Sequence, residues 1–456
     1  MDLYQRPQYH FQPLANWMND PNGLIHWQGQ YHLFYQHNPN GPQWAQMHWG
    51  HAVSPDLVHW RHLPMALAPT PGGADKDGVF SGCAIDHDGV PTLVYTGVTP
   101  QVQCLATSED MIHWSKHPAN PVLAAPPEGI PPQDFRDPFL WREADGWYAA
   151  IGSSTGDGLG IVLLYRTQDL LKWEYVGPLA EGETDETGRV WECPNFLCFG
   201  ERSALIISPI PLGRAIYLSG VYRDHALHVE GTHELDPGGA LYAPQVMVDA
   251  HGRHILFGWL WERREKEAQT KAGWAGVQSL PRILGMADDG KLTYAPAPEV
   301  RQLRGDGWHG AGIALRADTP WPCPLGGDTI EIVARFRLGS ASQIGLEMRR
   351  AEDGSEVTTV TYARDNEQLS VDTSRSSSDP SSLGDRYQAQ LAADDTLTLR
   401  LFLDRSVLEL FADDRACLTS RIYPRPTSLG LRALASGGDA ELLTIDVYPM
   451  RSIWSG

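Results

Sequence analysis

The chain has 456 residues, which is long for one hydrophobic core and favours two domains. Its 56 acidic and 36 basic residues give a net charge of −20, which argues against nucleic acid and anionic membranes as partners and leaves a neutral small molecule. Glycine (45), proline (34) and tryptophan (16) are abundant, and long amphipathic helical patterns are missing. We therefore expect an all-β protein of short strands and tight turns.

The N-terminal residues, MDLYQRPQYHF, contain no apolar segment behind a basic start, and the chain has no stretch of about 18 apolar residues. Its six cysteines form no C-x-x-C pair, so we expect reduced, mostly buried thiols rather than disulfides or zinc ligands. Both features predict a cytoplasmic protein. A secreted protein whose signal peptide had been removed would leave the same pattern.

A five-fold repeat of two apolar strands joined by a turn runs through the first two thirds of the chain. The copies are NDPNGLIHWQGQYHLFYQ, FSGCAIDHDGVPTLVYTG, RDPFLWREADGWYAAIGS, ECPNFLCFGERSALIISP and YAPQVMVDAHGRHILFGW. They start at Asp20, Gly82, Asp137, Glu192 and Pro244, which is a nearly constant spacing. The period is close to that of a four-stranded sheet and predicts a five-bladed β-propeller over residues 1–295. A β-sandwich with coincidental hairpins is the alternative.

A heptad also recurs, as SPDLVHW, SEDMIHW and TQDLLKW, ending at Trp60, Trp114 and Trp173. After residue 295 the pattern changes, and residues 296–309 have the composition of a linker. Alternating segments such as TIEIVARFRL and TLTLRLFLD then predict an antiparallel β-sandwich over residues 310–456. This second domain carries no group of residues typical of catalysis, and an association of identical chains through it is left open.

Three acids fall at equivalent places in the repeat, which are Asp20, Asp137 and Glu192. The first strand of each propeller blade lines the central channel, so we expect these side chains to meet. The sequence around Asp20, Asn-Asp-Pro-Asn-Gly, is a strong turn signal, and we expect a tight turn there. A turn-forming aspartate has no need of two acidic counterparts, however, and crowded carboxyl groups acquire perturbed pKa values. Paired carboxyl groups across a pocket are what the cleavage of a glycosidic bond requires.

Aromatic and polar residues near the same repeat starts favour a sugar as the ligand. The aromatic candidates are Trp17, Trp44, Trp49, Phe80 and Trp259, and the polar ones are Asn19, Gln36, Ser81 and Arg136. The histidines of HWGH and HWRH lack a matching carboxylate or thiol pattern, so we expect neither a metal nor a cofactor.

The motifs WMNDPNG, FRDP and WECP, in this order, resemble the three signatures of glycoside hydrolase family 32, the β-fructofuranosidases that include invertases, inulinases and levanases. FYQHNP, YAPQ and GWAGVQSLPR resemble other stretches of its propeller, and DRSVLELFADD with RIYP resembles its sandwich domain. The resemblance implies a retaining enzyme that releases terminal β-fructose from sucrose and short fructo-oligosaccharides without a cofactor. Retention in turn predicts a gap of about 5 to 5.5 Å between the two reacting carboxyl groups.

Carried over to this sequence, the resemblance makes Asp20 the nucleophile and Glu192 the acid/base, with Asp137 binding fructose hydroxyls and stabilising the transition state. Residues expected to line the fructose pocket are Asn19, Gln36, Trp44, Phe80, Ser81, Arg136 and Trp259. His37, Ala45 and Cys83 depart from the usual family residues, which bears on the preference among substrates.

Three rival functions stay open. One is an exo-acting inulinase or levanase that prefers longer fructans. Another is an inverting arabinan or xylan hydrolase on the same scaffold, whose carboxyl groups would lie about 6.5 to 9.5 Å apart. The third is a carbohydrate-binding propeller without catalysis, because a fold does not dictate function.

Overall fold

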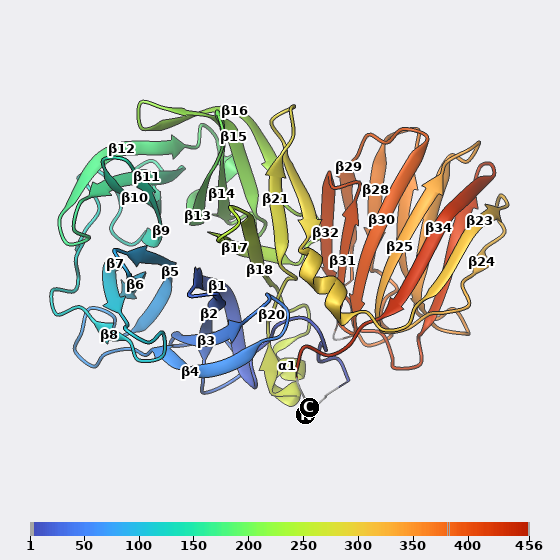
Figure 1. Ribbon diagram of the computed structural model, residues 1–456, viewed down its shortest axis with the longest axis horizontal. Coiled ribbons are helices and arrows are strands. Elements are labelled where there is room, and N and C mark those ends of the chain that lie inside the picture. The colour runs from blue at the N-terminus through green and yellow to red at the C-terminus, as the bar shows by residue number, and fades with distance from the viewer. Residues whose placement is uncertain (1–3, 381, 383, 455–456) are drawn as a thin grey trace.

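The computed structural model of the protein describes residues 4–380, 382 and 384–454. Five mainly antiparallel sheets surround a central axis, and a two-sheet sandwich packs beside the fifth of them (Figure 1). The all-β class expected from the sequence, a five-bladed β-propeller followed by a β-sandwich, is confirmed.

Each blade is a sheet whose strands run from the central axis outward. The strands of the first three blades are β1 (Asn16–Trp27), β2 (Gln30–Asn38), β3 (His48–Ser54) and β4 (Arg61–Leu67); β5 (Gly78–His87), β6 (Val90–Val98), β7 (Val102–Thr107) and β8 (Ser115–Lys116); and β9 (Phe135–Glu143), β10 (Gly146–Ser154), β11 (Gly160–Thr167) and β12 (Trp173–Glu181). Those of the last two are β13 (Val190–Phe199), β14 (Arg202–Ile210), β15 (Ile216–Arg223) and β16 (Ala226–Glu234); and β17 (Leu241–Val248), β18 (His254–Leu260), β20 (Val277–Gln278), β21 (Arg282–Met286) and β22 (Leu292–Pro296). All five expected repeat starts lie in the first strand of a blade.

The ring is closed by strand β19 (Trp274–Ala275), which follows the short helix α1 (Lys266–Ala272). It pairs in parallel with β1, so that a segment from the fifth blade completes the sheet of the first. Gly276 follows with a φ of +88°, and a Cβ atom there would lie 1.8 Å from the carbonyl oxygen of Met18. Only glycine allows this close approach of the two chain segments.

The recurring heptad forms the connection between the third and fourth strands of a blade. In the first copy, one oxygen of Asp56 accepts the backbone N–H groups of Val58 (3.2 Å) and His59 (2.9 Å). This arrangement holds Leu57 in the left-handed region, with a φ of +69°, while its side chain is completely buried. The indole N–H of Trp60 closes the turn on the carbonyl oxygen of Leu57 at 2.9 Å. The heptad is therefore a structural turn, and the other copies repeat its aspartate bonds.

Two six-stranded antiparallel sheets face each other in the sandwich. In spatial order the first has β23 (Trp308–Leu315), β34 (Ala440–Pro449), β25 (Thr329–Arg337), β30 (Thr396–Asp404), β31 (Val407–Ala412) and β32 (Ala416–Arg421); the second has β24 (Trp321–Pro322), β33 (Gly430–Ser436), β26 (Gln343–Arg350), β27 (Thr358–Ala363), β28 (Gln368–Asp372) and β29 (Arg386–Gln390). Two 3-10 helices complete the described elements, η1 (Asp185–Thr187) and η2 (Pro298–Leu303). Because η2 lies between the last propeller strand and β23, we propose residues 296–309 as the boundary between the domains.

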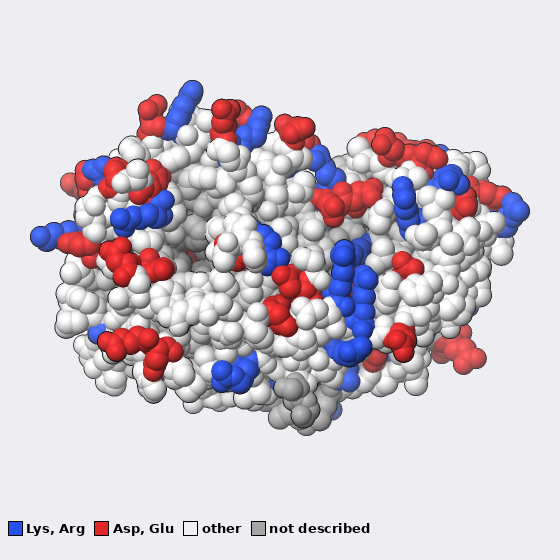
Figure 2. Space-filling model, viewed as in Figure 1, with Lys and Arg blue, Asp and Glu red and all other residues white. Residues whose placement is uncertain are grey.

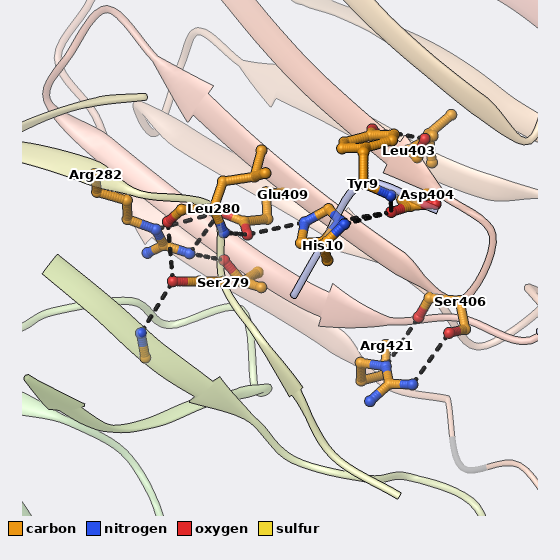
Figure 3. Close-up of polar contacts among 12 residues, drawn as sticks. Tyr9, His10, Ser279, Leu280, Arg282, Leu403, Asp404, Ser406, Glu409 and Arg421 are labelled. Carbon is orange, nitrogen blue, oxygen red and sulfur yellow. Dashed lines mark hydrogen bonds and ion pairs between the residues drawn. The ribbon is translucent and has the colours of Figure 1, made fainter. Parts of the chain in front are cut away.

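Charged side chains at the junction of the two domains are fully buried and paired (Figure 3). Both ring nitrogens of His10 contact carboxylates of the sandwich, Asp404 at 2.9 Å and Glu409 at 3.1 Å. Arg282 of the fifth blade binds Glu409 and Asp236, each at 2.8 Å. A buried charge is tolerated only when it is paired in this way, so the network fixes how the domains meet.

None of the helices in the described part of the chain is long and apolar enough to cross a membrane.

Candidate active site

The three acids singled out in the sequence lie on the first strands of three blades, in β1, β9 and β13. They line one cavity of about 280 Å³ at the propeller axis. The remaining residues of this cavity are Asn19, Gln36, Trp44, Phe80, Ser81, Arg136, Cys193, Tyr242, Ala243 and Trp259. The structure thus brings together all the residues expected to line the fructose pocket, although Asp20 and Glu192 are far apart in the sequence.

An irregularity in strand pairing occurs at the cavity in the first strand of every blade. Register shifts lie between Met18 and Pro21 in β1, between Phe80 and Gly82 in β5, and between Glu192 and Asn195 in β13. The pairing of β9 and of β17 shifts at the corresponding places. A bulge breaks the strict alternation of side chains and can re-aim a residue, which is why bulges are frequent beside active sites.

The turn expected at Asp20 is one of these bulges. Strand β1 continues through Asn-Asp-Pro-Asn-Gly from Asn16 to Trp27, so the sequence signal marks an irregularity within a strand rather than a reversal of the chain. At three other bulges of the pocket, Asp137, Cys193 and Ala243 lie in the left-handed backbone region, with φ values of +62°, +48° and +45°. Such strained positions in non-glycine residues gather at functional sites.

Asp20 is held by three donors. The hydroxyl of Ser81 donates to Oδ2 at 2.6 Å, and the side-chain amide of Asn19 donates to Oδ1 at 3.0 Å. The thiol of Cys193 lies 3.7 Å from Oδ2. Burial, with a smaller contribution from the charge of Glu192, raises the pKa of Asp20 to about 6, although the bonds from Ser81 and Asn19 oppose the rise. Asp20 is therefore a carboxylate above about pH 6, fixed in orientation and short of solvent.

Asp137 lies deeper and is 6% exposed. Its Oδ2 accepts the backbone N–H of Cys193 at 3.0 Å and lies 3.5 Å from the thiol of the same residue. Burial raises the pKa of Asp137 well above its usual range, and the charge of Glu192 adds to the rise while Arg136 opposes it. A carboxyl group in this state can both donate and accept hydrogen bonds to a sugar.

Glu192 is partly exposed, with 23% of its side chain accessible. Its two oxygens have separate partners, because Arg136 Nε donates to Oε1 at 3.1 Å and the hydroxyl of Tyr242 donates to Oε2 at 2.9 Å. Arg136 is fixed in turn by Asp134 at 2.9 Å. Tyr242 belongs to YAPQ, which the sequence marks as a repeat start, but nothing in the local pattern ties this tyrosine to an acid of the preceding blade.

Aromatic rings surround the opening of the cavity. Trp44 is 57% exposed and packs edge-on against Phe80, with 6.2 Å between the ring centres. Trp259 packs edge-on against Trp17 at 5.6 Å. Trp49, the remaining aromatic candidate, is instead completely buried, and its indole N–H donates to the carbonyl oxygen of Phe80 at 3.1 Å. Exposed tryptophan faces beside a polar pocket suit the apolar face of a sugar ring.

Gln245 of β17 forms hydrogen bonds with two other blades. Its side-chain amide donates to the carbonyl oxygen of Gly82 at 2.6 Å, and its side-chain oxygen accepts the N–H of Leu24 at 3.0 Å. These bonds tie three blades together across the axis. Gln245 lines a separate cavity of about 500 Å³.

The charge of the molecule is unevenly distributed. Figure 2 shows acidic and basic side chains interspersed over the propeller, and a stripe of Lys and Arg along the seam between the domains. In the described residues, no three His, Cys, Asp or Glu side chains are grouped so that they could hold a metal ion. His51 of HWGH instead contacts His32 at 3.0 Å, and His62 of HWRH stacks on Trp454.

Comparison with known proteins gives a consistent result. The family model for the N-terminal domain of glycosyl hydrolases family 32 matches residues 10–296, and the model for the family's C-terminal domain matches residues 299–449. The chain is 36% identical to a sucrose-6-phosphate hydrolase of Escherichia coli over 468 residues, covering 96% of this chain and 93% of that protein. It is also 36% identical to a raffinose invertase of Escherichia coli over 471 residues, with the same coverage. Among solved structures, fructan 1-exohydrolase IIa of Cichorium intybus superposes with a TM-score of 0.92 at 27% identity, covering 99% of this chain and 98% of that one.

Proposed function

The chain belongs to glycosyl hydrolase family 32 and is a β-fructofuranosidase, and from this premise we propose that it releases terminal β-fructose from sucrose and short fructo-oligosaccharides with retention of configuration. The observation that carries the proposal is the pocket itself, where Asp20, Asp137 and Glu192 converge within about 280 Å³.

We assign the nucleophile to Asp20. Its carboxylate attacks the anomeric carbon of fructose through an oxocarbenium-like transition state and forms a covalent intermediate. Hydrogen bonds from Ser81 and Asn19 fix the orientation of the Asp20 carboxylate. A fixed orientation makes the attack efficient.

We assign proton transfer to Glu192. It delivers a proton to the departing oxygen and then removes one from the water that hydrolyses the intermediate. Arg136 and Tyr242 hold its two oxygens and thereby aim the group at the leaving oxygen. Asp137 binds hydroxyl groups of the fructose, and its bonds strengthen as positive charge develops on the ring.

The fructose unit that enters the pocket is uncharged rather than phosphorylated. Among the described residues that line the pocket, Arg136 is the one cation, and it is already bound by Glu192 and Asp134. A phosphate at the pocket would face three carboxyl groups without a free cation to bind it, which is unfavourable. We expect kcat/KM for sucrose to exceed that for sucrose phosphorylated at O6 of its fructose unit, and a preference for that phosphorylated sugar would refute this part of the proposal.

The main test is a product assay on sucrose, raffinose, inulin and levan in parallel, with the anomer of the first-formed fructose determined by NMR. Release of β-fructose from sucrose and raffinose, and slower release from the polymers, is the expected result. Faster release from inulin or levan would favour an exo-acting fructanase, and α-fructose would contradict retention. Cleavage of arabinan but not of sucrose would overturn the assignment.

Replacing Glu192 by Gln tests the division of roles. The variant lacks the proton donor, so hydrolysis of sucrose should fall by about 10²- to 10⁴-fold. An aryl β-fructofuranoside has a leaving group that needs little protonation and should lose much less. Equal losses on the two substrates would show that Glu192 is not the acid.

Two further properties belong to the same proposal. The cysteines among the described residues are free thiols, which is compatible with a cytoplasmic protein. Association of identical chains through the sandwich domain would be tested by light scattering.

A further inference from the structure

Glu409, on strand β31 of the sandwich, is completely buried and reaches across to the propeller (Figure 3). One carboxylate oxygen accepts the backbone N–H of Leu280 at 2.7 Å and contacts His10 at 3.1 Å. The other accepts Arg282 Nη2 at 2.8 Å. One side chain of the second domain therefore holds both the segment before β1 and the segment between β20 and β21.

Gln278, two residues before Leu280, connects the segment bound by Glu409 to the active site. Gln278 is completely buried, and its backbone N–H donates to the carbonyl oxygen of Phe11 at 2.9 Å. Its side-chain amide donates to the carbonyl oxygen of Asn19 at 2.7 Å. In the β18–β20 ladder Gln278 also pairs with Trp259, which lines the pocket.

Asn19 completes the connection. Its side-chain amide donates to Asp20 Oδ1 at 3.0 Å, and its side-chain oxygen accepts the indole N–H of Trp17 at 2.7 Å. The backbone of Asn19 is fixed by Gln278, and its side chain fixes the carboxylate of Asp20. A connected series of contacts thus runs from Glu409 of the sandwich to Asp20 in the pocket.

We propose that Glu409 and Gln278 are positioning residues for the nucleophile, and that the sandwich domain acts in catalysis by holding β1 in register at Asp20. The inference rests on the proposed function only in that Asp20 is the reacting group. Glu409 touches no substrate, so its effect is on the orientation of Asp20 and not on sugar binding. Small errors in the placement of a nucleophile reduce the rate of attack strongly.

Two variants interrupt the series at different points. Glu409→Gln keeps the size of the side chain but removes the charge that attracts His10 and Arg282. Gln278→Met keeps the volume of the side chain and removes the donor to Asn19. The matched control is Ser406→Ala, because Ser406 is equally buried at the domain interface, donates to the carbonyl oxygen of Gln5 at 2.6 Å and accepts from Arg421 at 3.1 Å. Neither of these two bonds leads to Asn19.

For both test variants we expect kcat on sucrose to fall about tenfold or more while KM changes little, since the lost interaction serves the transition state. The acidic limb of the kcat/KM profile should also move to higher pH, because the bond from Asn19 lowers the pKa of Asp20. For Ser406→Ala we expect a lower melting temperature, but neither a fall in kcat nor a shift of the acidic limb. Activity is compared well below the melting temperature of the least stable variant.

Hydrogen exchange supplies a readout that does not depend on activity. Amide exchange in residues 16–27 should accelerate in Gln278→Met and Glu409→Gln relative to Ser406→Ala. Unchanged exchange there, or kcat losses that follow melting temperature equally in all three variants, would overturn the inference. If the wild-type protein failed to cleave sucrose, the proposed function would fail, whereas the exchange result would still decide whether Glu409 holds β1.

Discussion

Asp20 experiences two opposing effects, one from burial and one from its hydrogen bonds. Burial and the nearby Glu192 raise its pKa to about 6, while Ser81 and Asn19 stabilise the ionised form. The balance leaves a carboxylate at neutral pH that is poorly solvated and therefore reactive. Because its pKa is raised by folding, the ionised side chain of Asp20 also lowers the free energy of unfolding at neutral pH.

Removing the hydroxyl of Ser81 should shift the pH dependence of the reaction. In Ser81→Ala the pKa of Asp20 rises because a bond to its charged form is lost, and such bonds are worth about 1.5 to 3 kcal/mol, or roughly one to two pH units. The acidic limb of kcat/KM should move upward by about that amount, as measured on sucrose across buffers of constant ionic strength. The control is Ser108→Ala, because the Ser108 hydroxyl also donates to an aspartate, Asp110, but in a turn outside the pocket. An equal shift in the control would contradict the explanation.

Asp20→Asn should abolish turnover and stabilise the protein at neutral pH. The pKa of Asp20 is higher in the folded chain than its usual value of 3.8, so the folded state binds the proton more tightly and loses stability as pH rises from about 4 to 6. An uncharged asparagine avoids this cost, which is about 1 to 3 kcal/mol at pH 7. Urea unfolding at pH 7 and at about pH 4 should show the gain only at the higher pH. A gain of equal size at both values would rule out this origin.

The sequence identifies some residues of the site and not others for a physical reason. Asp20, Asp137 and Glu192 recur at repeat positions, so their convergence follows from the symmetry of the propeller. Tyr242 and Cys193 act through contacts with acids on other strands, and no local pattern predicts those contacts. The separation of the Asp20 and Glu192 carboxyl groups, expected at about 5 to 5.5 Å for retention, stays a prediction.

At the scale of the strand, bulges and residues in the left-handed backbone region orient the side chains of the active site. Proline and glycine in Asn-Asp-Pro-Asn-Gly both disfavour regular strand pairing, and they account for the bulge at this place. Neighbouring strands nevertheless hold the segment extended as part of β1. Tertiary pairing overrides the local propensity there. Strands β19 and β20 are very short and could not be predicted, because β19 pairs with a strand at the opposite end of the propeller sequence.

The recurring heptad gives a test at this scale. Asp56→Ala removes the acceptor of two backbone N–H groups and leaves Leu57 in an unfavourable conformation, so the free energy of unfolding should fall by about 1 to 2 kcal/mol. Denaturant unfolding measures the change, and kcat per folded molecule should be unaffected. Asp56→Asn retains an acceptor and should recover most of the stability; if it does not, the turn bonds are not the cause.

For the whole molecule, the two domains share one buried network of charges, and His10 is its most unusual member. Both ring nitrogens of His10 face carboxylates, so both must carry a proton. Burial lowers the pKa of His10, but the bonds and charges of Asp404 and Glu409 outweigh it and raise the pKa above 6.5. The folded structure therefore favours the charged form of His10 more than the unfolded chain does.

His10→Gln should weaken the protein in a pH-dependent way. Because the pKa is higher in the folded than in the unfolded chain, the stabilisation by His10 is complete below about pH 6.5 and disappears as pH rises through the folded pKa. The difference in unfolding free energy between wild type and variant should be on the order of 3 kcal/mol at about pH 6 and should decrease as the pH rises through the folded pKa of His10. Thermal unfolding at a series of pH values measures it. A difference that stays constant or grows with pH would mean that His10 is neutral in the folded chain.

The closure of the ring has a consequence for how the enzyme is made. Strand β1, which carries Asp20, obtains its partner β19 only after residue 275 has left the ribosome. At roughly 5 to 20 residues per second, translation takes more than about ten seconds between the two segments. During this interval β1 has an unpaired edge beside the future pocket. The nascent chain is thus exposed to aggregation at the same strand that it needs for catalysis, and the first residues synthesised are among the last to become functional.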